Sequence, residues 1–422
     1  MVAYHYPPQS GSSGVLRSLK FSKYLLEYGW LSTVLTAHVR AYERTDPQQL
    51  NEIPAQVRVI RAFALDTKRH LSWRNSYPRS LAIPDRWVSW ALGAVPSGVA
   101  AIYHERIDVI FTTYPIATAN LIGVFLHHMT KRPWVVDFRD SMTEETYPPD
   151  RRTWRTYRWI ELQAVRHASA LLFTAPSCMK MYLQRYPSLS GDRCFVVYNG
   201  YDEEDFAGIQ IPGGEPSIQD RPVILLHSGM LYPDERDPKP FFTAVSRLKA
   251  QGILRSSDIL IRLRATGLDQ VYAEMVQNYG IDDIVQVLPP IPYHASLTEA
   301  ASADGLLIFQ ARNCDHQIPA KLFEYFRLAK PIFALVSPTG DTATLLSEVG
   351  GATLAGLDEE DKIFHALPRF VAALKSRAHP LPEAQKVKSF CRSKQAQDLA
   401  SILDSVAPRC ETRYEKPRTH RC

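Results

Sequence analysis

The sequence predicts an α/β protein with two domains, each built on a parallel β-sheet. Three observations lead to this prediction. The chain has 422 residues, which is too long for one ordinary hydrophobic core. Strand-like and helix-like patterns alternate through most of it, which is typical of parallel sheets covered by helices. A stretch rich in Gly, Pro and polar residues, 207–222, separates two alternating regions and suits a linker between domains.

In the first region, a turn rich in Gly and Ser follows a short opening strand and precedes an amphipathic helix that ends at Gly29. Short β-prone runs then alternate with helical patterns. Strands are predicted at 1–6, 32–36, 57–61, 109–112, 134–138, 170–174 and 194–198, and helices at 15–27, 116–128, 151–166 and from about residue 177. These elements assign a first domain to residues 1–206.

The second region repeats the alternation after the linker. Strands are predicted at 223–227, 260–265, 285–288, 305–309 and 332–336, with helices at 241–251 and near Leu297. These elements assign a second domain to 223–385. A helix at 386–405 follows it, and the basic tail at 406–422 is expected to be disordered.

Composition describes an ordinary soluble globular protein, with 45% hydrophobic and 22% charged residues. No apolar run approaches the ~20 residues needed to span a bilayer, and the N-terminus does not resemble a signal peptide. The six cysteines have neither paired nor metal-ligand spacing, so we expect no metal site, no disulfide framework and a cytoplasmic location. The opening strand is short for a buried parallel strand, which suggests missing residues upstream of Met1.

Basic residues concentrate at 151–166, where five arginines are interleaved with Trp154, Tyr157 and Trp159. A basic aromatic helix of this kind can lie on an anionic membrane surface. A solvated helix face whose aromatic residues pack on the domain explains the pattern equally well. Nucleic acid is a weaker interpretation, because no basic recognition motif occurs in a known fold context, and no nucleic-acid partner is expected.

The most informative stretch is 304–336. A strand ends at Phe309, a polar loop follows, and Pro319 stands in the first turn of a helix, where its fixed φ fits and its missing N–H is not needed. Lys321 lies in that turn, and Glu324 follows on the same face. Because helix N-termini at the carboxyl ends of parallel strands favour phosphates, Lys321 can face a diphosphate and Glu324 can accept two ribose hydroxyls. A surface ion pair between the two is the alternative.

A second charged loop lies in the segment LLHSGMLYPDERDPKPFF, residues 225–242. Arg236 and Lys239 are the two basic residues of this loop, and the planar guanidinium of arginine suits phosphate oxygens. The acidic residues at 234, 235 and 237 could instead neutralise both cations in a solvated loop.

Two further motifs lie in the first domain. In YPPQSGSSGVLR, residues 6–17, Gly11 and Gly14 permit close approach of the backbone to a ligand, although a simple turn explains them as well. In VVDFRD, residues 135–140, Asp140 follows the apolar run, and Asp137 is expected to cap or to pair locally with Arg139.

Taken in this order, the motifs resemble those of retaining GT-B glycosyltransferases, the family that includes bacterial polysaccharide and lipopolysaccharide transferases. The resemblance extends from the glycine-rich loop to the final helix. It implies two Rossmann-like domains facing across a cleft, with the C-terminal helix returning to the first domain.

The resemblance also implies residue roles. Glu324 corresponds to the family's ribose contact, but His316 stands where a first glutamate is expected near the sugar, so sugar recognition is left to His316 or to its neighbours Asp315, Gln317 and Ile318. The implied donor-binding residues are Gly14, Gly229, Arg236, Lys239, His316, Ile318, Lys321, Leu322 and Glu324. The implied catalytic residues are Asp140, Arg236 and Lys239.

The implied function is transfer of a sugar, with retention, from a UDP- or GDP-linked donor to a lipid-linked or saccharide acceptor. The enzyme would be a metal-independent hexosyltransferase of cell-surface polysaccharide biosynthesis, without a further cofactor, in the cytoplasm or at the inner face of the plasma membrane. Two alternatives stay open. A sugar-nucleotide epimerase or hydrolase of the same fold needs a placed pair of acid and base carboxylates, and a catalytically silent binding partner is compatible with His316 and with the short first strand.

Overall fold

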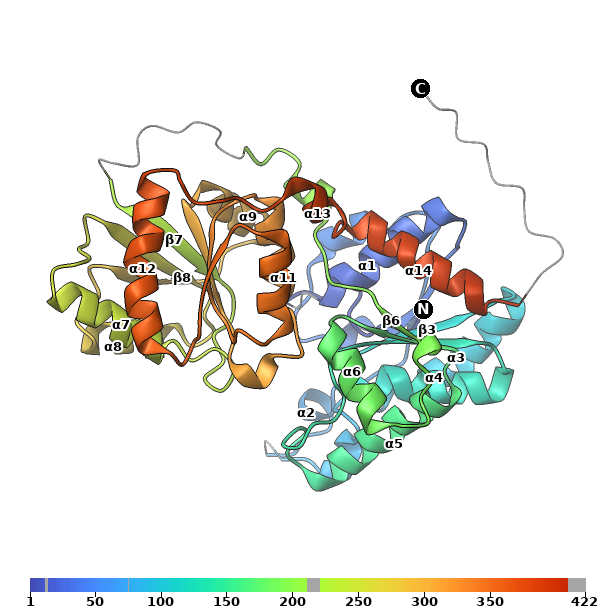
Figure 1. The fold of residues 1–422 in the computed structure, drawn as a ribbon. Helices are drawn as coiled ribbons and strands as arrows, with labels where there is room; N and C mark the ends of the chain where they lie inside the picture. The colour runs from blue at the N-terminus through green and yellow to red at the C-terminus, as the bar shows by residue number, and fades with distance from the viewer. Residues whose placement is uncertain (12–13, 75, 211–220, 409–422) are drawn as a thin grey trace. The chain divides into compact units, whose positions relative to one another are not determined.

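The computed structural model of the chain describes residues 1–11, 14–74, 76–210 and 221–408. The chain forms two compact units, one comprising Met1–Tyr198 and the chain from Arg392 onward, the other Asn199–Cys391 (Figure 1). In both units the paired strands of the sheets run parallel and alternate with helices. The predicted α/β fold class is therefore confirmed.

The first unit contains one parallel sheet whose two halves meet at the opening segment. Val2 forms bridges to Leu35 and to Thr112 and so joins the two halves. The order across the sheet is β2(Arg58–Ala62), β1(Thr33–Ala37), Val2, β3(Ile110–Thr113), β4(Trp134–Arg139), β5(Ala170–Phe173) and β6(Cys194–Val196). The strand predicted at 1–6 is thus reduced to a bridge, because Pro7 and Pro8 have no N–H to extend a ladder.

Helices cover both halves of this sheet. They are α1(Gly14–Tyr24), α2(Thr67–His70), α3(Trp90–His104), α4(Ala117–Thr130), α5(Arg151–His167), α6(Pro176–Arg185) and α14(Arg392–Val406). Figure 1 shows α14 beside α1, and both bury apolar side chains, among them Phe21 and Leu399, against Val135 and Leu172 of the sheet. Gly29, at φ 81°, ends the 3₁₀ segment that continues α1, as predicted.

The second unit is a six-stranded sheet. Its order is β12(Ala352–Ala355), β11(Ile332–Leu335), β10(Gly305–Phe309), β7(Val223–Ser228), β8(Ile259–Arg264) and β9(Val285–Leu288). Its helices are α7(Lys239–Ala250), α8(Asp269–Asn278), α9(Tyr293–Ser302), α10(Ala320–Arg327), α11(Asp341–Val349), α12(Glu360–Lys375) and α13(Ala384–Lys388). From β7 the chain builds the sheet to one side and from β10 to the other, so the topological switch point lies between these two strands.

Short 3₁₀ segments complete the described elements: η1(Leu25–Tyr28), η2(Val39–Ala41), η3(Pro47–Glu52), η4(Arg79–Ala82), η5(Gly191–Arg193), η6(Glu203–Phe206) and η8(Arg312–Cys314). The second unit begins at Asn199, upstream of the predicted linker at 207–222, because η6 packs on α9 and Tyr201 bridges to Cys391. Residues 211–220 of that linker, and 409–422 of the predicted tail, lie outside the described residues.

The single helix predicted at 386–405 is wrong. The chain instead forms α13 in the second unit and α14 in the first, separated at 389–391. Phe390 causes the break, because its ring packs on Phe323 and Phe326 of α10 and its carbonyl accepts the N–H of Tyr201. The chain nevertheless re-enters the first unit at Arg392, as the expected return to the first domain requires.

Candidate functional site

The candidate site of the second unit lies at the carboxyl ends of β7 and β10, where open α/β sheets bind their ligands. The loop after β7 and the loop after β10 are joined there by two hydrogen bonds. The N–H of Ala311 donates to the carbonyl of Glu235 at 2.7 Å, and Asn313 Nδ2 donates to the carbonyl of Asp234 at 3.1 Å. The two charged segments singled out in the sequence therefore form one edge of the unit.

The loop 310–319 is held from inside by Gln310, a buried residue at the end of β10. Its Nε2 donates to the carbonyls of Cys314 at 2.8 Å and Gln317 at 2.9 Å. This fixes the backbone around His316, whose side chain is half-buried, and it places Ile318 in the core. The helix α10 begins directly after Pro319, so Lys321 lies in its first turn, as predicted.

Glu324 has a buried carboxylate whose two oxygens differ in their partners. The residue is 8% exposed, and Tyr293 Oη donates to its Oε1 at 2.9 Å. Lys321 Nζ lies 3.2 Å from Oε2 and 5.8 Å from the Tyr293 ring centroid, but Oε2 accepts no hydrogen bond within the described part of the chain. The predicted ion pair thus exists, but on a buried carboxylate that can still accept hydroxyl groups.

His227 is a member of this site that sequence reasoning missed. It lies in β7, and its buried Nδ1 stands 2.9 Å from the carbonyl of Leu307, so Nδ1 carries the proton. Burial lowers the pKa of His227 to about 4, and the charges of Arg236 and Lys321 act in the same direction. Its Nε2 has no hydrogen-bond partner among the described residues and is therefore a neutral, buried acceptor at pH 7.

Gly229 lies two residues after His227 and has φ at +154°, a conformation that suits glycine. A Cβ placed there would lie 3.9 Å from His227 Nε2. The sequence signal for this histidine is its position, because the polar residues His227 and Ser228 end an otherwise apolar strand just before Gly229.

Arg236 and Lys239 differ in their surroundings. Arg236 Nη1 donates to the carbonyl of Met230 at 3.0 Å, and its guanidinium lies over the ring of Tyr232. Lys239 begins α7; its side chain is 59% exposed, and its Nζ lies 3.8 Å from Asp237 Oδ2. An exposed pair at this distance holds its cation weakly, so a phosphate can compete for Lys239.

The loop after β7, which carries Gly229 and Arg236, lies next to α10, which carries Lys321 and Glu324, because the N–H of Ser228 donates to Tyr325 Oη at 3.2 Å. Lys239 lies at the start of the neighbouring helix. Leu322 is fully buried, and its N–H donates to the carbonyl of Pro319 at 3.0 Å.

In the first unit, the expected local pair between Asp137 and Arg139 is wrong. Asp137 is fully buried and binds Arg17 through two hydrogen bonds, Nε to Oδ2 at 2.9 Å and Nη2 to Oδ1 at 2.8 Å, while Thr113 Oγ1 donates to Oδ2. The irregularity in β4 between Asp137 and Arg139, with Arg139 at φ 59°, directs the two side chains differently. Asp140 follows, half-buried, at the carboxyl end of β4.

Gly14 is the first residue of α1, and a Cβ there would lie 2.5 Å from His5 Nδ1. Close packing therefore requires glycine at this position, which a simple turn would not.

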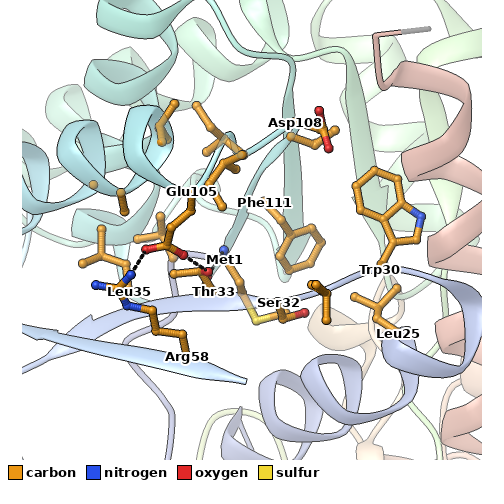
Figure 2. A pocket seen from close by; sticks show the side chains of 18 of the residues that line it. Met1, Leu25, Trp30, Ser32, Thr33, Leu35, Arg58, Glu105, Asp108 and Phe111 are labelled. Atoms are coloured by element: carbon orange, nitrogen blue, oxygen red, sulfur yellow. Dashed lines mark hydrogen bonds and ion pairs between the residues drawn. The ribbon is translucent and has the colours of Figure 1, made fainter. Parts of the chain in front are cut away.

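A cavity of about 440 Å³ lies at the opposite end of the first unit's sheet, at the amino ends of β1, β2 and β3. Figure 2 shows Glu105 on its wall, paired with Arg58 Nη1 at 2.5 Å and accepting from Thr33 Oγ1 at 2.5 Å. The Met1 amino group donates to the carbonyl of Thr33, and burial lowers its pKa to about 5. This cavity is separate from the carboxyl-end residues described above.

The described residues contain neither a membrane-spanning helix nor a cluster of metal ligands. No helix among them is long and apolar enough to cross a membrane. No three His, Cys, Asp or Glu side chains among them are placed to hold a metal ion.

Residues 18–200 match the family model of the glycosyl transferase 4-like domain. Among curated proteins, none matches the sequence of this chain.

Solved structures resemble the chain over nearly its whole length. HepE of Anabaena, in complex with UDP and glucose, has a TM-score of 0.64 at 15% identity, covering 96% of this chain and 99% of HepE. WaaG, a glycosyltransferase involved in lipopolysaccharide biosynthesis, has 0.61 at 13% identity, covering 95% and 99%. A UDP-N-acetylglucosamine 2-epimerase has 0.54 at 13% identity, covering 96% of each chain. At these identities the likeness establishes the fold.

Proposed function

Because the chain has the GT-B fold of glycosyltransferases and carries a glycosyl transferase 4-like domain at residues 18–200, we propose that it transfers a sugar from a nucleotide-sugar to an acceptor hydroxyl. The observation that carries this proposal is the carboxylate of Glu324, which is buried at the switch point of the second unit. Its Oε2 accepts no hydrogen bond from the described residues, and Lys321 lies beside it. Such a carboxylate suits the two vicinal hydroxyls of a ribose, and the cation suits a diphosphate.

In the proposed reaction, the acceptor hydroxyl attacks the anomeric carbon from the face that the diphosphate leaves, and the departing diphosphate takes the hydroxyl proton. The sugar is thereby transferred with retention. Arg236, Lys239 and Lys321 stabilise the negative charge that develops on the leaving group, which is the largest electrostatic demand of this reaction. Asp140 is proposed to orient the acceptor from the first unit.

A UDP-linked hexose is the proposed donor, because HepE of Anabaena was solved with UDP and glucose. A thermal-shift series tests this with UDP-glucose, GDP-mannose and ADP-glucose on the full chain. We expect UDP-glucose to raise the melting temperature, since a ligand at 100 times its Kd stabilises the folded state by about 2.7 kcal/mol. A shift with none of the three would contradict the proposal and favour a silent binding protein.

Product analysis separates transfer from the other activities of this fold. Incubation with UDP-glucose and a mixture of lipid-linked and free saccharides should give UDP together with a modified acceptor. UDP released without a modified acceptor would indicate a hydrolase, and an epimerised nucleotide-sugar would indicate the epimerase alternative.

The acceptor is proposed to be lipid-linked, which follows from the surface around α5. Part of the basic aromatic pattern of that helix serves the fold. Arg158 binds the buried Glu161, Trp154 Nε1 donates to the carbonyl of Glu144, and Tyr157 is buried. The remaining positions face solvent: Arg151, Arg152, Arg155, Arg166 and the 44% exposed Trp159.

Further exposed residues, in 71–74 and 76–81, lie next to the start of α5, since Arg79 Nη1 is 4.0 Å from Asp150 Oδ1 at the α5 N-cap. They include Trp73 at 79% exposure and Leu81 at 44%, together with the exposed Arg74. Exposed Trp and Leu beside arginines form a surface suited to the interface of an anionic membrane. WaaG, of similar fold, is involved in lipopolysaccharide biosynthesis.

Vesicle co-sedimentation checks this surface. The wild-type chain should bind vesicles that contain phosphatidylglycerol more tightly than neutral vesicles. Replacing Arg151, Arg152 and Arg155 together by Gln should weaken binding about 100-fold, because each basic residue near such a surface contributes roughly 1 kcal/mol. The matched control replaces the exposed Arg255 and Arg369 of the second unit by Gln, and equal loss in both variants would refute the assignment.

A further inference from the structure

Tyr293 connects two acidic side chains of the second unit through one hydroxyl group. It is the first residue of α9, directly after the proline-rich segment 289–292, and it is 38% exposed. Its Oη lies 2.9 Å from Glu324 Oε1 and 3.4 Å from Oδ2 of Asp205 in η6. A phenol has a single O–H to donate, so Glu324, the nearer carboxylate, receives the proton and Asp205 is the weaker, competing acceptor.

Two side chains cover the carboxylate of Glu324. Tyr293 donates to Oε1, and Lys321 Nζ lies 3.2 Å from Oε2, which is inaccessible to solvent. A ribose therefore reaches Oε2 only when the ammonium group of Lys321 moves, and a diphosphate bound beside it attracts that ammonium group. The Lys321 side chain is 30% exposed, so this movement requires no rearrangement of the core.

Once a diphosphate attracts Lys321, Tyr293 is the remaining side chain that orients Glu324 within the described part of the chain. The terminal torsion of a glutamate has broad preferences, so the carboxylate plane is poorly fixed without a hydrogen bond. The bond to Oε1 fixes that plane and leaves the lone pairs of Oε2 to accept hydroxyl groups. A carboxylate held in this way binds its ligand at a smaller entropic cost.

We propose that Tyr293 is a positioning residue for the ribose contact, because its hydroxyl holds Glu324 so that Oε2 receives the 2′- and 3′-hydroxyls of the nucleotide. The assignment rests on the proposed function, in which Glu324 binds ribose. Tyr293 is given no contact with the reacting atoms. Its hydroxyl therefore favours ribonucleotides over their deoxy analogues and acts on nucleotide binding.

The test measures how strongly the protein prefers UDP to 2′,3′-dideoxyuridine diphosphate, which lacks both hydroxyls. Calorimetry gives the two Kd values for the full chain, for Tyr293→Phe and for Tyr279→Phe. Tyr279 is the matched control, a half-buried tyrosine at the C-cap of α8 whose ring packs on Phe242. We expect the wild type and Tyr279→Phe to prefer UDP about tenfold or more, and Tyr293→Phe to prefer it less than about threefold. If the thermal-shift series selects another base, the same pair of diphosphates of that base is used.

The preference for the hydroxyls separates positioning from a purely structural role. A tyrosine that only stabilises the fold, or that only stacks on the base, would weaken both ligands equally when it is replaced. An unchanged preference in Tyr293→Phe would therefore overturn the proposal, whatever the change in affinity. If Tyr293→Phe does not fold, Tyr293→Leu, which also removes the hydroxyl, serves in its place.

Glu324→Gln distinguishes failure of this assignment from failure of the proposed function. A preference that is lost in Glu324→Gln but kept in Tyr293→Phe would retain the ribose contact and remove Tyr293 from it. A preference kept in Glu324→Gln would show that ribose binds elsewhere, so that the ribose contact of the proposed function and the role of Tyr293 would fail together.

Asp205→Asn checks where the proton of Tyr293 lies. Because the carboxylate of Asp205 competes with Glu324 for that proton, Asp205→Asn should prefer UDP as strongly as the wild type or more strongly. A lost preference in this variant would assign the proton to Asp205 and overturn the proposal.

Discussion

Glu324→Gln is expected to lower sugar transfer about 100-fold while the protein stays folded. Glutamine keeps the volume of the side chain, and its amide oxygen still accepts the hydroxyl of Tyr293, which lies 2.9 Å from Oε1 in the structure. At the position of Oε2, however, an amide nitrogen replaces the oxygen, so the side chain loses its negative charge and the acceptor at that position. Hydrogen bonds to a charged group contribute about 1.5–3 kcal/mol each, and two ribose hydroxyls would be affected.

Turnover of UDP-glucose and calorimetric binding of UDP measure the effect. The matched control is Glu348→Gln, an exposed glutamate near the end of α11 in the same unit, for which both quantities should equal those of the wild type. Lys239→Ala should also lose most turnover. Wild-type turnover in both Glu324→Gln and Lys239→Ala would sink the site assignment. Weak transfer with unchanged UDP binding would instead move Glu324 from the ribose to the sugar.

The fold was predictable where local pattern and tertiary structure agree. Each predicted strand of the second region lies within a residue or two of an observed one, because apolar β-prone runs bounded by turn residues can be buried only as strands in this fold class. One helix of the first unit was not predicted, and the reason is local. The helix α3 was missed because Gly93, Pro96 and Gly98 resemble breakers, yet Gly93 and Gly98 lie where a Cβ would come within 2.9 Å of Phe63 or Leu126 atoms.

Of the site, the sequence could predict only the contact between two residues within one turn of a helix. Lys321 and Glu324 stand three residues apart on α10, so their proximity follows from helical geometry. His227 and Tyr293 are different. Their roles depend on the order of the strands in the sheet and on the position of α9, because His227 contacts Leu307, 80 residues away, and Tyr293 contacts Glu324, 31 residues away.

The same reasoning explains the wrong pairing of Asp137. The local sequence indicated Arg139, two residues away, as the partner of Asp137. The observed partner is Arg17, 120 residues earlier in the chain. Alternating directions along a strand place residues 137 and 139 on one face, and only the irregularity in β4 and the positive φ of Arg139 change this. Such a backbone feature has no simple sequence signature.

Arg17→Met is expected to lower the free energy of unfolding by about 3–5 kcal/mol, the usual cost of removing one partner of a buried pair. Arg17 is 1% exposed and Asp137 fully buried, and the guanidinium also donates to the carbonyls of Tyr198 at 2.9 Å and Val197 at 3.1 Å. The substitution therefore leaves the buried Asp137 carboxylate with the Thr113 hydroxyl but without its cation, and removes the side-chain donor from two carbonyls. Guanidinium unfolding followed by circular dichroism measures the loss.

An exposed ion pair provides the control. Lys249 and Asp283 lie 2.6 Å apart at the surface, with side chains 36% and 43% exposed. Lys249→Met should cost less than about 1 kcal/mol, because solvent already screens that pair. Equal losses for Arg17→Met and Lys249→Met would show that burial does not set the strength of the Arg17–Asp137 pair.

The double variant Arg17→Met/Asp137→Leu distinguishes the pair's own contribution from the cost of breaking it. When both charges leave together, no buried charge remains unpaired, so the double variant should be more stable than the sum of the two single losses predicts, with a coupling of about 1–3 kcal/mol. Additive losses would mean that Arg17 acts mainly through the carbonyls of Val197 and Tyr198. In that case the arginine would stabilise the last residues of the first unit before Asn199, and Asp137 would serve only to orient it.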